Sequence, residues 1–155
     1  MTPQTATVNA YKTVNINTAS QGKLILMLFD GAIKRAEEAI RQIEKNNIES
    51  VHRNLIRAQE IISELRSSLK IDVGGEIARN IDRIYEYIYY LLVQGNLKKE
   101  IKPIRESIEH MKSMRQTWKE AFEIFQKEEG ATISGDTEPQ EVTQPLGTST
   151  FNLSI

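Results

Sequence analysis

The sequence predicts an all-α fold, an elongated antiparallel four-helix bundle with up-down-up-down topology. Apolar residues recur every three or four positions throughout residues 18–129, and no segment there alternates as a β-strand would. Four such segments of about 20 to 28 residues are separated by short polar loops, which favour antiparallel neighbours. Helices of that length span about 30 to 40 Å at 1.5 Å per residue, so the bundle should be a rod.

Residues 1–17 are expected to form an extended N-terminal arm. They are mostly polar, and their large apolar residues show no sustained helical period; these are Val8, Tyr11, Val14 and Ile16. Thr18 and Ser20 are suitable N-cap residues, because a hydroxyl oxygen accepts hydrogen bonds from the free amides of a first turn. The first helix is therefore predicted to begin near Thr18 and to end near Lys45.

The second and third helices are predicted from two heptad-like seams. In residues 48–70 apolar residues are spaced by 4, 3, 4, 3 and 4 positions: Val51, Leu55, Ala58, Ile62, Leu65 and Leu69. In residues 76–94 the spacing is 4, 3, 4 and 3: Ile77, Ile81, Ile84, Ile88 and Leu91. The loop between them contains Gly74 and Gly75, which tolerate positive φ, and Gly95 with Asn96 is expected to end the third helix.

The fourth helix is predicted to start near Pro103, because proline suits the first turn of a helix. It should end near Gly130, and its apolar residues are Ile104, Ile108, Met111, Met114, Trp118, Phe122 and Phe125. Residues 130–155 are rich in Thr, Ser, Gly and Pro, acidic and aperiodic, which is typical of a flexible tail. Its last residues, FNLSI, are locally apolar and could dock on a surface. The predicted organisation is therefore an arm (1–17), a bundle (18–129) and a tail.

Composition argues against several classes of protein. Lys and Arg number 20 against 21 Asp and Glu, and the net charge of −1 argues against a nucleic-acid partner. The chain has no cysteine, so it has no disulfide framework and no thiol nucleophile. No apolar run approaches the roughly 20 residues of a membrane span, and residues 1–12 lack the pattern of a secretory signal. A cytoplasmic protein is expected.

A metal centre or an enzyme is not expected either. A di-iron site in a four-helix bundle needs a Glu-x-x-His motif on each of two helices. Glu49 and His52 form one such motif, but Ser107 is the residue three positions before His110, the only other histidine. Neither a catalytic triad nor a phosphate-binding glycine loop is recognisable, so no cofactor is predicted.

Two segments contain more apolar residues than one buried stripe needs. LILMLF at 24–29 is continuously apolar, and YEYIYYLL at 85–92 contains four tyrosines. Tyr85 suits the core, whereas Tyr87 and Tyr90 cannot both be core as well. Such surplus marks a partner site in many proteins, and a groove between bundle helices accepts an amphipathic helix. The predicted groove residues are Ile25, Leu28, Phe29, Ile33, Tyr85, Tyr87 and Tyr90. The alternative is that a wide seam simply packs against two neighbouring helices.

One ordered series of motifs runs through the chain: Ala10-Tyr11, NTASQGKLILMLFDGAIKRAEEA, NLIRAQEIISELRSSL, Gly-Gly-Glu at 74–76, Ile84-Tyr85-Glu86-Tyr87, Gly95-Asn96 and Trp118. With these motifs the chain resembles, from about Tyr11 to Trp118, the FliS family of flagellar export chaperones. The order and spacing of these motifs are more specific than any one of them. The departures are mild: the family often has Pro at Gln21, Tyr at Phe29 and Asp at Glu86.

The resemblance implies a chaperone that binds the disordered C-terminal segment of flagellin. It would prevent premature polymerisation and keep the client competent for type III export. Contacts with the flagellar export gate and with regulatory proteins are also implied, and Tyr11 would belong to an arm that caps the groove without client. The alternative function is a structural bundle that self-associates through its apolar flanks. The expected oligomeric state is a monomer or a weak homodimer.

Overall fold

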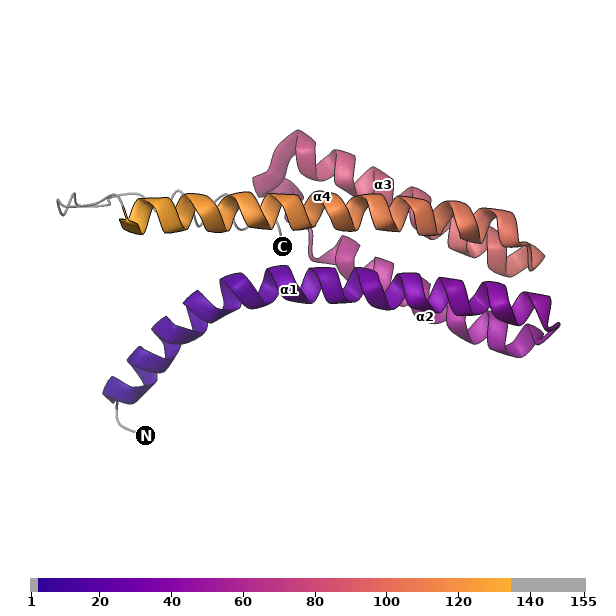
Figure 1. Cartoon of the computed structure of the whole chain (residues 1–155), viewed down its shortest axis with the longest axis horizontal. Helices are drawn as coiled ribbons and strands as arrows, with labels where there is room; N and C mark the ends of the chain where they lie inside the picture. Colours follow the sequence, from indigo (N-terminus) through magenta and orange to yellow (C-terminus); the bar gives the residue numbers. More distant parts are fainter. Residues whose placement is uncertain (1–2, 135–155) are drawn as a thin grey trace.

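A computed structural model describes the backbone of residues 3–134 and the side chains of residues 20–130. It contains α1 (Pro3–Glu44), α2 (Ile48–Ser67), α3 (Ile71–Lys98) and α4 (Ile101–Ser134), shown in Figure 1. Between residues 3 and 134 there is no β-strand. The all-α prediction is confirmed.

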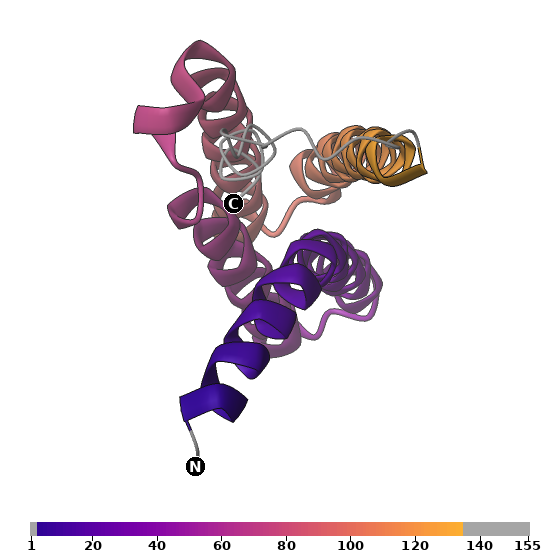
Figure 2. The same ribbon diagram turned by 90° about the vertical axis from the view of Figure 1, so that its left-hand side faces the viewer.

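The four helices form an up-down-up-down bundle. Each helix runs antiparallel to the one before it, α1 packs against α2 and α4, and α3 packs against the same two helices (Figures 1 and 2). This closed ring of contacts gives every helix two neighbours and one shared core. All six residues of the seam predicted for residues 48–70 lie in the core and are at most 9% exposed: Val51, Leu55, Ala58, Ile62 and Leu65 of α2, and Leu69 just after it.

Helix α1 begins much earlier than predicted. It starts at Pro3, so the expectation of an extended arm is wrong for residues 3–17, and Thr18 and Ser20 lie inside the helix. The physical reason is that the sequence from Gln4 to Gln21 contains neither glycine nor proline, and proline itself is favourable at a first helical position. The first turns of α1 diverge from the other helices (Figure 1).

Helix α3 differs from the prediction at both ends. It starts at Ile71 and contains a kink at Gly75, whose φ of 56° and ψ of −131° confirm the expected need for glycine. It continues through Gly95 to Lys98, and Lys99 is the left-handed cap. Gly95 is required for packing instead, because a Cβ atom there would lie 2.4 Å from Cγ1 of Ile104 in α4.

Helix α4 contains Pro103 in its first turn, as predicted, and extends past the expected end near Gly130 to Ser134. The rest of the predicted tail, residues 135–155, lies outside the described residues. Ion pairs connect α4 to α1 and α2 to α3. Arg115 Nε lies 2.5 Å from Asp30 of α1, and Arg66 Nε lies 2.6 Å from Asp82 of α3.

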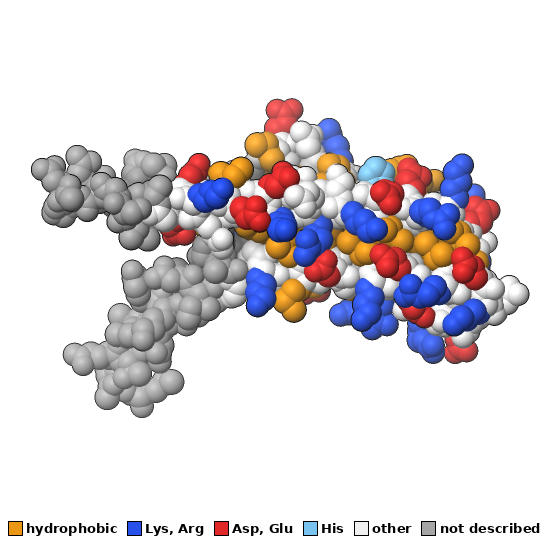
Figure 3. Space-filling view, in the orientation of Figure 1, with side chains coloured by type: hydrophobic (Ala, Val, Ile, Leu, Met, Phe, Trp, Pro, Cys, Tyr) orange, Lys and Arg blue, Asp and Glu red, His pale blue; other side chains and the backbone are white. Residues whose placement is uncertain are grey.

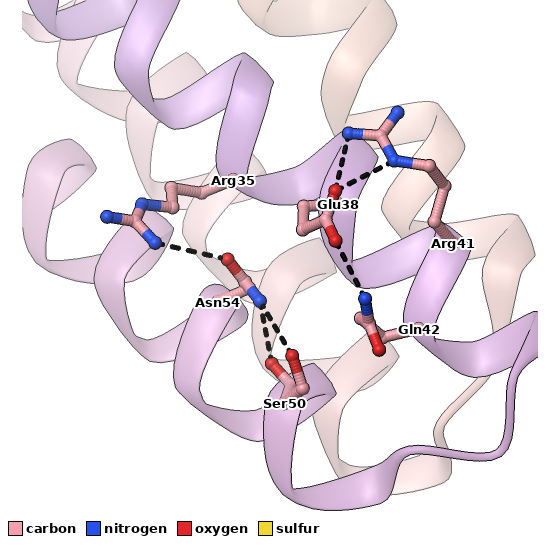
Figure 4. Close-up of polar contacts among 6 residues, drawn as sticks. All are labelled: Arg35, Glu38, Arg41, Gln42, Ser50 and Asn54. Atoms are coloured by element: carbon pink, nitrogen blue, oxygen red, sulfur yellow. Dashed lines mark hydrogen bonds and ion pairs between the residues drawn. The ribbon is translucent and has the colours of Figure 1, made fainter.

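Two separate sets of polar contacts lie near the turn between α1 and α2 (Figure 4), and the first of them joins the two helices. Arg35 donates to Asn54 Oδ1 at 3.3 Å, and the buried Asn54 amide donates to the carbonyl oxygen of Ser50 at 2.8 Å. Gln42 and Arg41 both donate to Glu38, and these hydrogen bonds lower the pKa of its carboxyl group. The Asn54 contacts satisfy a buried amide, which would otherwise destabilise the fold, whereas the Glu38 contacts lie within α1.

Candidate partner-binding surface

An aromatic cluster fills the centre of the bundle. The rings of Phe29 and Tyr85 lie 6.0 Å apart, Trp118 Nε1 donates to the Tyr85 hydroxyl at 2.7 Å, and Trp118 stacks on Phe122. A Cβ atom on Gly22 would lie 3.1 Å from the Phe122 ring, so α1 and α4 pack closely here. Burial raises the pKa of Tyr85, and the hydrogen bond from Trp118 partly opposes this shift. The cluster therefore joins α1, α3 and α4 in the core.

The predicted groove residues divide into two groups. Four of them are core residues, at most 9% exposed, and are not accessible to a partner in this arrangement: Ile25, Phe29, Ile33 and Tyr85. Leu28 is half-buried, while Tyr87 and Tyr90 are 43% and 52% exposed. The reason is that α1 contacts both α2 and α4, so its broad apolar stripe is covered on two sides. For Ile25 and Phe29 of α1 the alternative interpretation, a wide seam that packs against two neighbours, describes the structure. Tyr85, on α3, lies in the core, which the sequence analysis considered suitable for it.

Part of the apolar surplus of α1 nevertheless remains at the surface. Within LILMLF, Leu24 and Met27 are more than half exposed, and Leu26 is half-buried against the core. Asp30 contacts α4 through Arg115, so positions one turn away, such as Leu26 and Ile33, face the same neighbour. Figure 3 shows hydrophobic side chains in a strip along the junction of α1 and α4, with charged side chains on both sides.

A second exposed apolar surface lies on α3, and we name it the α3 face: Ile77, Ile84, Tyr87 and Tyr90. The rings of Tyr87 and Tyr90 stack with centroids 6.3 Å apart, and His110 of α4 meets the Tyr87 ring edge-on at 5.4 Å. The Tyr87 hydroxyl donates to Glu106 Oε1 at 2.7 Å, a bond that raises the pKa of Tyr87. Helix α4 therefore holds the Tyr87 ring in place although the ring is exposed.

Sequence periodicity did not reveal the exposure of Ile77 and Ile84. Both belong to the seam predicted to be buried, yet they are 70% and 38% exposed. Ile88 and Leu91, further along the same seam, are at most 5% exposed. Periodicity locates the apolar side of a helix but does not show where along the helix its neighbours cover it. One feature of the sequence could have indicated this exposure: Gly75 interrupts α3 just before Ile77, and the exposed part of the helix begins there.

The two histidines of the chain each make a pairwise contact with a neighbouring helix. Among the side chains of residues 20–130, no three His, Asp or Glu residues are grouped so as to hold a metal ion. His52 shares a hydrogen bond with Asn96 at 3.0 Å, and His110 lies against Tyr87. No helix in the described part of the chain is both long and apolar enough to cross a membrane.

Comparison with known proteins identifies the family. The profile of the family described as "Flagellar protein FliS" matches residues 4–124, most of the chain. The chain belongs to the FliS family. The flagellar secretion chaperone FliS of Bacillus subtilis (strain 168) is 34% identical over 119 residues, which cover 77% of this chain and 88% of the relative. Those of Vibrio cholerae and Salmonella typhimurium are each 31% identical and cover 72% and 73% of this chain, and 85% and 87% of their own length.

FliS membership agrees with the architecture. The matched region includes α1 from its second residue, α2, α3 and α4 as far as Ile124. The exposed α3 face therefore lies within the family match, whereas the last turns of α4 and residues 135–155 lie beyond it. The curated relatives named above are chaperones, a class that acts by binding a client protein.

Proposed function

We propose that this FliS-family protein is a flagellar secretion chaperone that binds the disordered C-terminal segment of flagellin. Binding prevents premature polymerisation and keeps flagellin competent for type III export from the cytoplasm. The observation that carries the proposal is the exposed α3 face on a chain that belongs to this family. Contacts with the flagellar export gate and with regulatory proteins belong to the same proposal.

The driving force is burial of apolar surface. An amphipathic client segment buries its apolar side against Ile84, Tyr87 and Tyr90 instead of against another flagellin. Each large apolar side chain that becomes buried contributes about 1.5–3 kcal/mol. Ordering of the client costs a few kcal/mol, so the complex is specific and reversible, as export requires. The hydrogen bond from Tyr87 to Glu106 fixes that ring before the client arrives, which reduces the entropy lost on binding.

The residues predicted as groove residues have two roles in this proposal. Tyr87 and Tyr90 contact the client, and Leu28 borders the exposed apolar residues of α1, Leu24 and Met27. The core residues support these surfaces from beneath: Ile25, Phe29, Ile33 and Tyr85. The capping role of Tyr11 is part of the proposal too, although its side chain lies outside the described residues.

The decisive experiment is a titration of the full chain with a peptide from the C-terminus of the cognate flagellin. Calorimetry measures the dissociation constant, and circular dichroism measures the helix that the peptide gains. Tyr87→Ser and Tyr90→Ser should each weaken binding about tenfold, which corresponds to about 1.4 kcal/mol, with little change in thermal stability. Ile48→Ser is the matched control, since Ile48 is also about half exposed (51%) but belongs to α2 and not to the α3 face.

Two further measurements are the stability of a core variant and the oligomeric state of the chain. Phe29→Ser should reduce the free energy of unfolding by about 3–5 kcal/mol, because it removes a large buried ring. If both tyrosine variants bind the peptide as tightly as the control, the α3 face is not the client surface. Light scattering over a range of concentrations tests the alternative function. A stable homodimer that the tyrosine substitutions dissociate would replace the client proposal with self-association.

A further inference from the structure

We infer that residues 151–155 of this chain dock on the α3 face and cover Ile77 and Ile84. The docking is intramolecular and needs no client. Its role as a placeholder that the client displaces rests on the proposed function. Three observations support the inference: the exposure at the start of α3, the pattern of residues 135–155, and the position at which α4 ends.

The surface at the start of α3 is apolar and open. Ile77 is 70% exposed and Ile84 is 38% exposed, and Val73, which precedes the kink at Gly75, is 53% exposed. No side chain among residues 20–130 covers them further. A soluble protein rarely leaves several large aliphatic side chains exposed together unless another segment covers them.

The segment beyond α4 has its apolar residues concentrated at one place. Residues 135–150 contain two large apolar residues, Val142 and Leu146, and three acids without any lysine or arginine. Residues 151–155 then contain three large apolar residues at alternate positions: Phe151, Leu153 and Ile155. In an extended chain alternate side chains lie on the same side, so all three can face one surface.

The antiparallel packing of α3 and α4 brings this segment within reach. Gly95 lies opposite Ile104, and Tyr85 contacts Trp118, so the start of α3 lies beside the C-terminal half of α4 (Figure 1). The linker 135–150 spans up to about 55 Å when extended. The stretch of α3 from Ile77 to Tyr90 is about 20 Å long. The tether therefore reaches the whole α3 face, and a short tether gives an effective concentration of about a millimolar.

Charge favours the same placement. Arg83 lies one helical turn before Tyr87 on the same side of α3 and forms no ion pair with the residues that the structure describes. Asp136, Glu138 and Glu141 of the linker supply complementary charge. Glu76 is the one acid on this side near Ile77, and it disfavours contact of the linker with the first turn. We therefore place the acidic linker nearer to Arg83.

Disulfide trapping tests the docking, and the absence of native cysteine makes it specific. Asn80→Cys lies one turn after Ile77. Ser149→Cys lies on the same side of an extended segment as Phe151 and leaves the three apolar residues intact. Under mild oxidation the full chain with this pair should form an intramolecular disulfide. The matched control has the same pair with Phe151→Ser, Leu153→Ser and Ile155→Ser. Its tether is identical, so any difference reports apolar docking, and we expect trapping to be about tenfold slower in it.

Equal trapping rates in the two proteins would overturn the inference, and so would a disulfide that forms mainly between two chains. The role of the segment is measured separately, with the flagellin peptide and the triple serine variant without added cysteines. If the segment competes with the client, this variant should bind the peptide several-fold more tightly than the unmodified chain. Trapping without any peptide binding would leave the docking intact and would contradict the proposed function instead.

Discussion

Tyr85 and Tyr87 lie two positions apart on α3, and the two side chains have different environments. Tyr85 is 1% exposed and accepts a hydrogen bond from Trp118, whereas Tyr87 is 43% exposed and donates to Glu106. The sequence could predict this difference in part, because four tyrosines within one helical segment cannot all face the core. It could not predict the partners, since both Trp118 and Glu106 belong to a helix that is distant in sequence.

Tyr85→Phe should destabilise the bundle by about 1–3 kcal/mol. The substitution leaves the buried indole N–H of Trp118 without its acceptor, and an unsatisfied buried donor has about this effect. Chemical denaturation measures the difference in the free energy of unfolding. Tyr90→Phe is the control, because its ring is 52% exposed, and its effect should stay within about 0.5 kcal/mol. Equal effects of the two substitutions would contradict the assigned hydrogen bond.

The same residue predicts how stability depends on alkaline pH. Burial raises the pKa of Tyr85 in the folded state above the value of about 10 in the unfolded chain. The folded state therefore binds this proton more tightly, and its contribution is complete below pH 10 and is lost as the pH rises further. The wild-type chain should lose about 1.4 kcal/mol more per pH unit above pH 10 than Tyr85→Phe. If the free energy of unfolding of the wild type and of Tyr85→Phe fell equally with pH, the Tyr85 phenol would not be desolvated in the folded state.

At the scale of helices, the buried seam of α2 was predicted more accurately than the roles of the glycines at the two ends of α3. The α2 seam was predicted correctly, because its periodicity matches a helix covered along its whole length. The glycine at position 75 was correctly expected to break the chain direction. Gly95 was expected to end α3, but it lies inside the helix. Sequence alone does not distinguish a glycine needed for a cap from one needed for close packing, because the neighbouring helix decides.

Gly95→Ala should destabilise the protein. The added methyl group would lie 2.4 Å from Cγ1 of Ile104, and overpacking typically costs about 1–3 kcal/mol. Alanine recovers at most about 1 kcal/mol through its higher helix propensity. Gly31→Ala is the control, since the nearest atom there is Ile61 Cδ1 at 3.6 Å, and this variant should be as stable as the wild type or more stable. Thermal unfolding of both variants would decide between the two roles of Gly95.

At the scale of the whole molecule, the bundle class and its topology followed from four periodic segments joined by short loops. The candidate partner-binding surface could be predicted from the sequence only in part. A surplus of apolar residues on two helices was apparent, but the residues expected at a groove were mostly those that fill the core. Composition gives the amount of apolar surface in a helix. The assignment of each residue to core or surface depends on how the helices are placed around it.

Deletion of residues 1–17 tests how the molecule uses its long first helix. The described contacts of α1 with α4 begin near Gly22, which packs against Phe122, and continue through Asp30. The truncated chain should therefore keep the bundle, with a free energy of unfolding within about 1 kcal/mol of the full chain. The affinity for the flagellin peptide should change, because Tyr11 is removed. A truncated chain that is unfolded would show instead that the first turns of α1 are structural.

The stacking of Trp118 on Phe122 has a practical consequence. Trp118 is the single tryptophan of the chain and is 6% exposed, so its fluorescence reports one position at the centre of the bundle without any label. A ligand that settles on the outside of α3 leaves the emission maximum unchanged. One that separates α4 from its neighbours admits water to the indole and shifts the emission to longer wavelength. Ordinary spectroscopy can thus distinguish surface attachment from opening of the bundle.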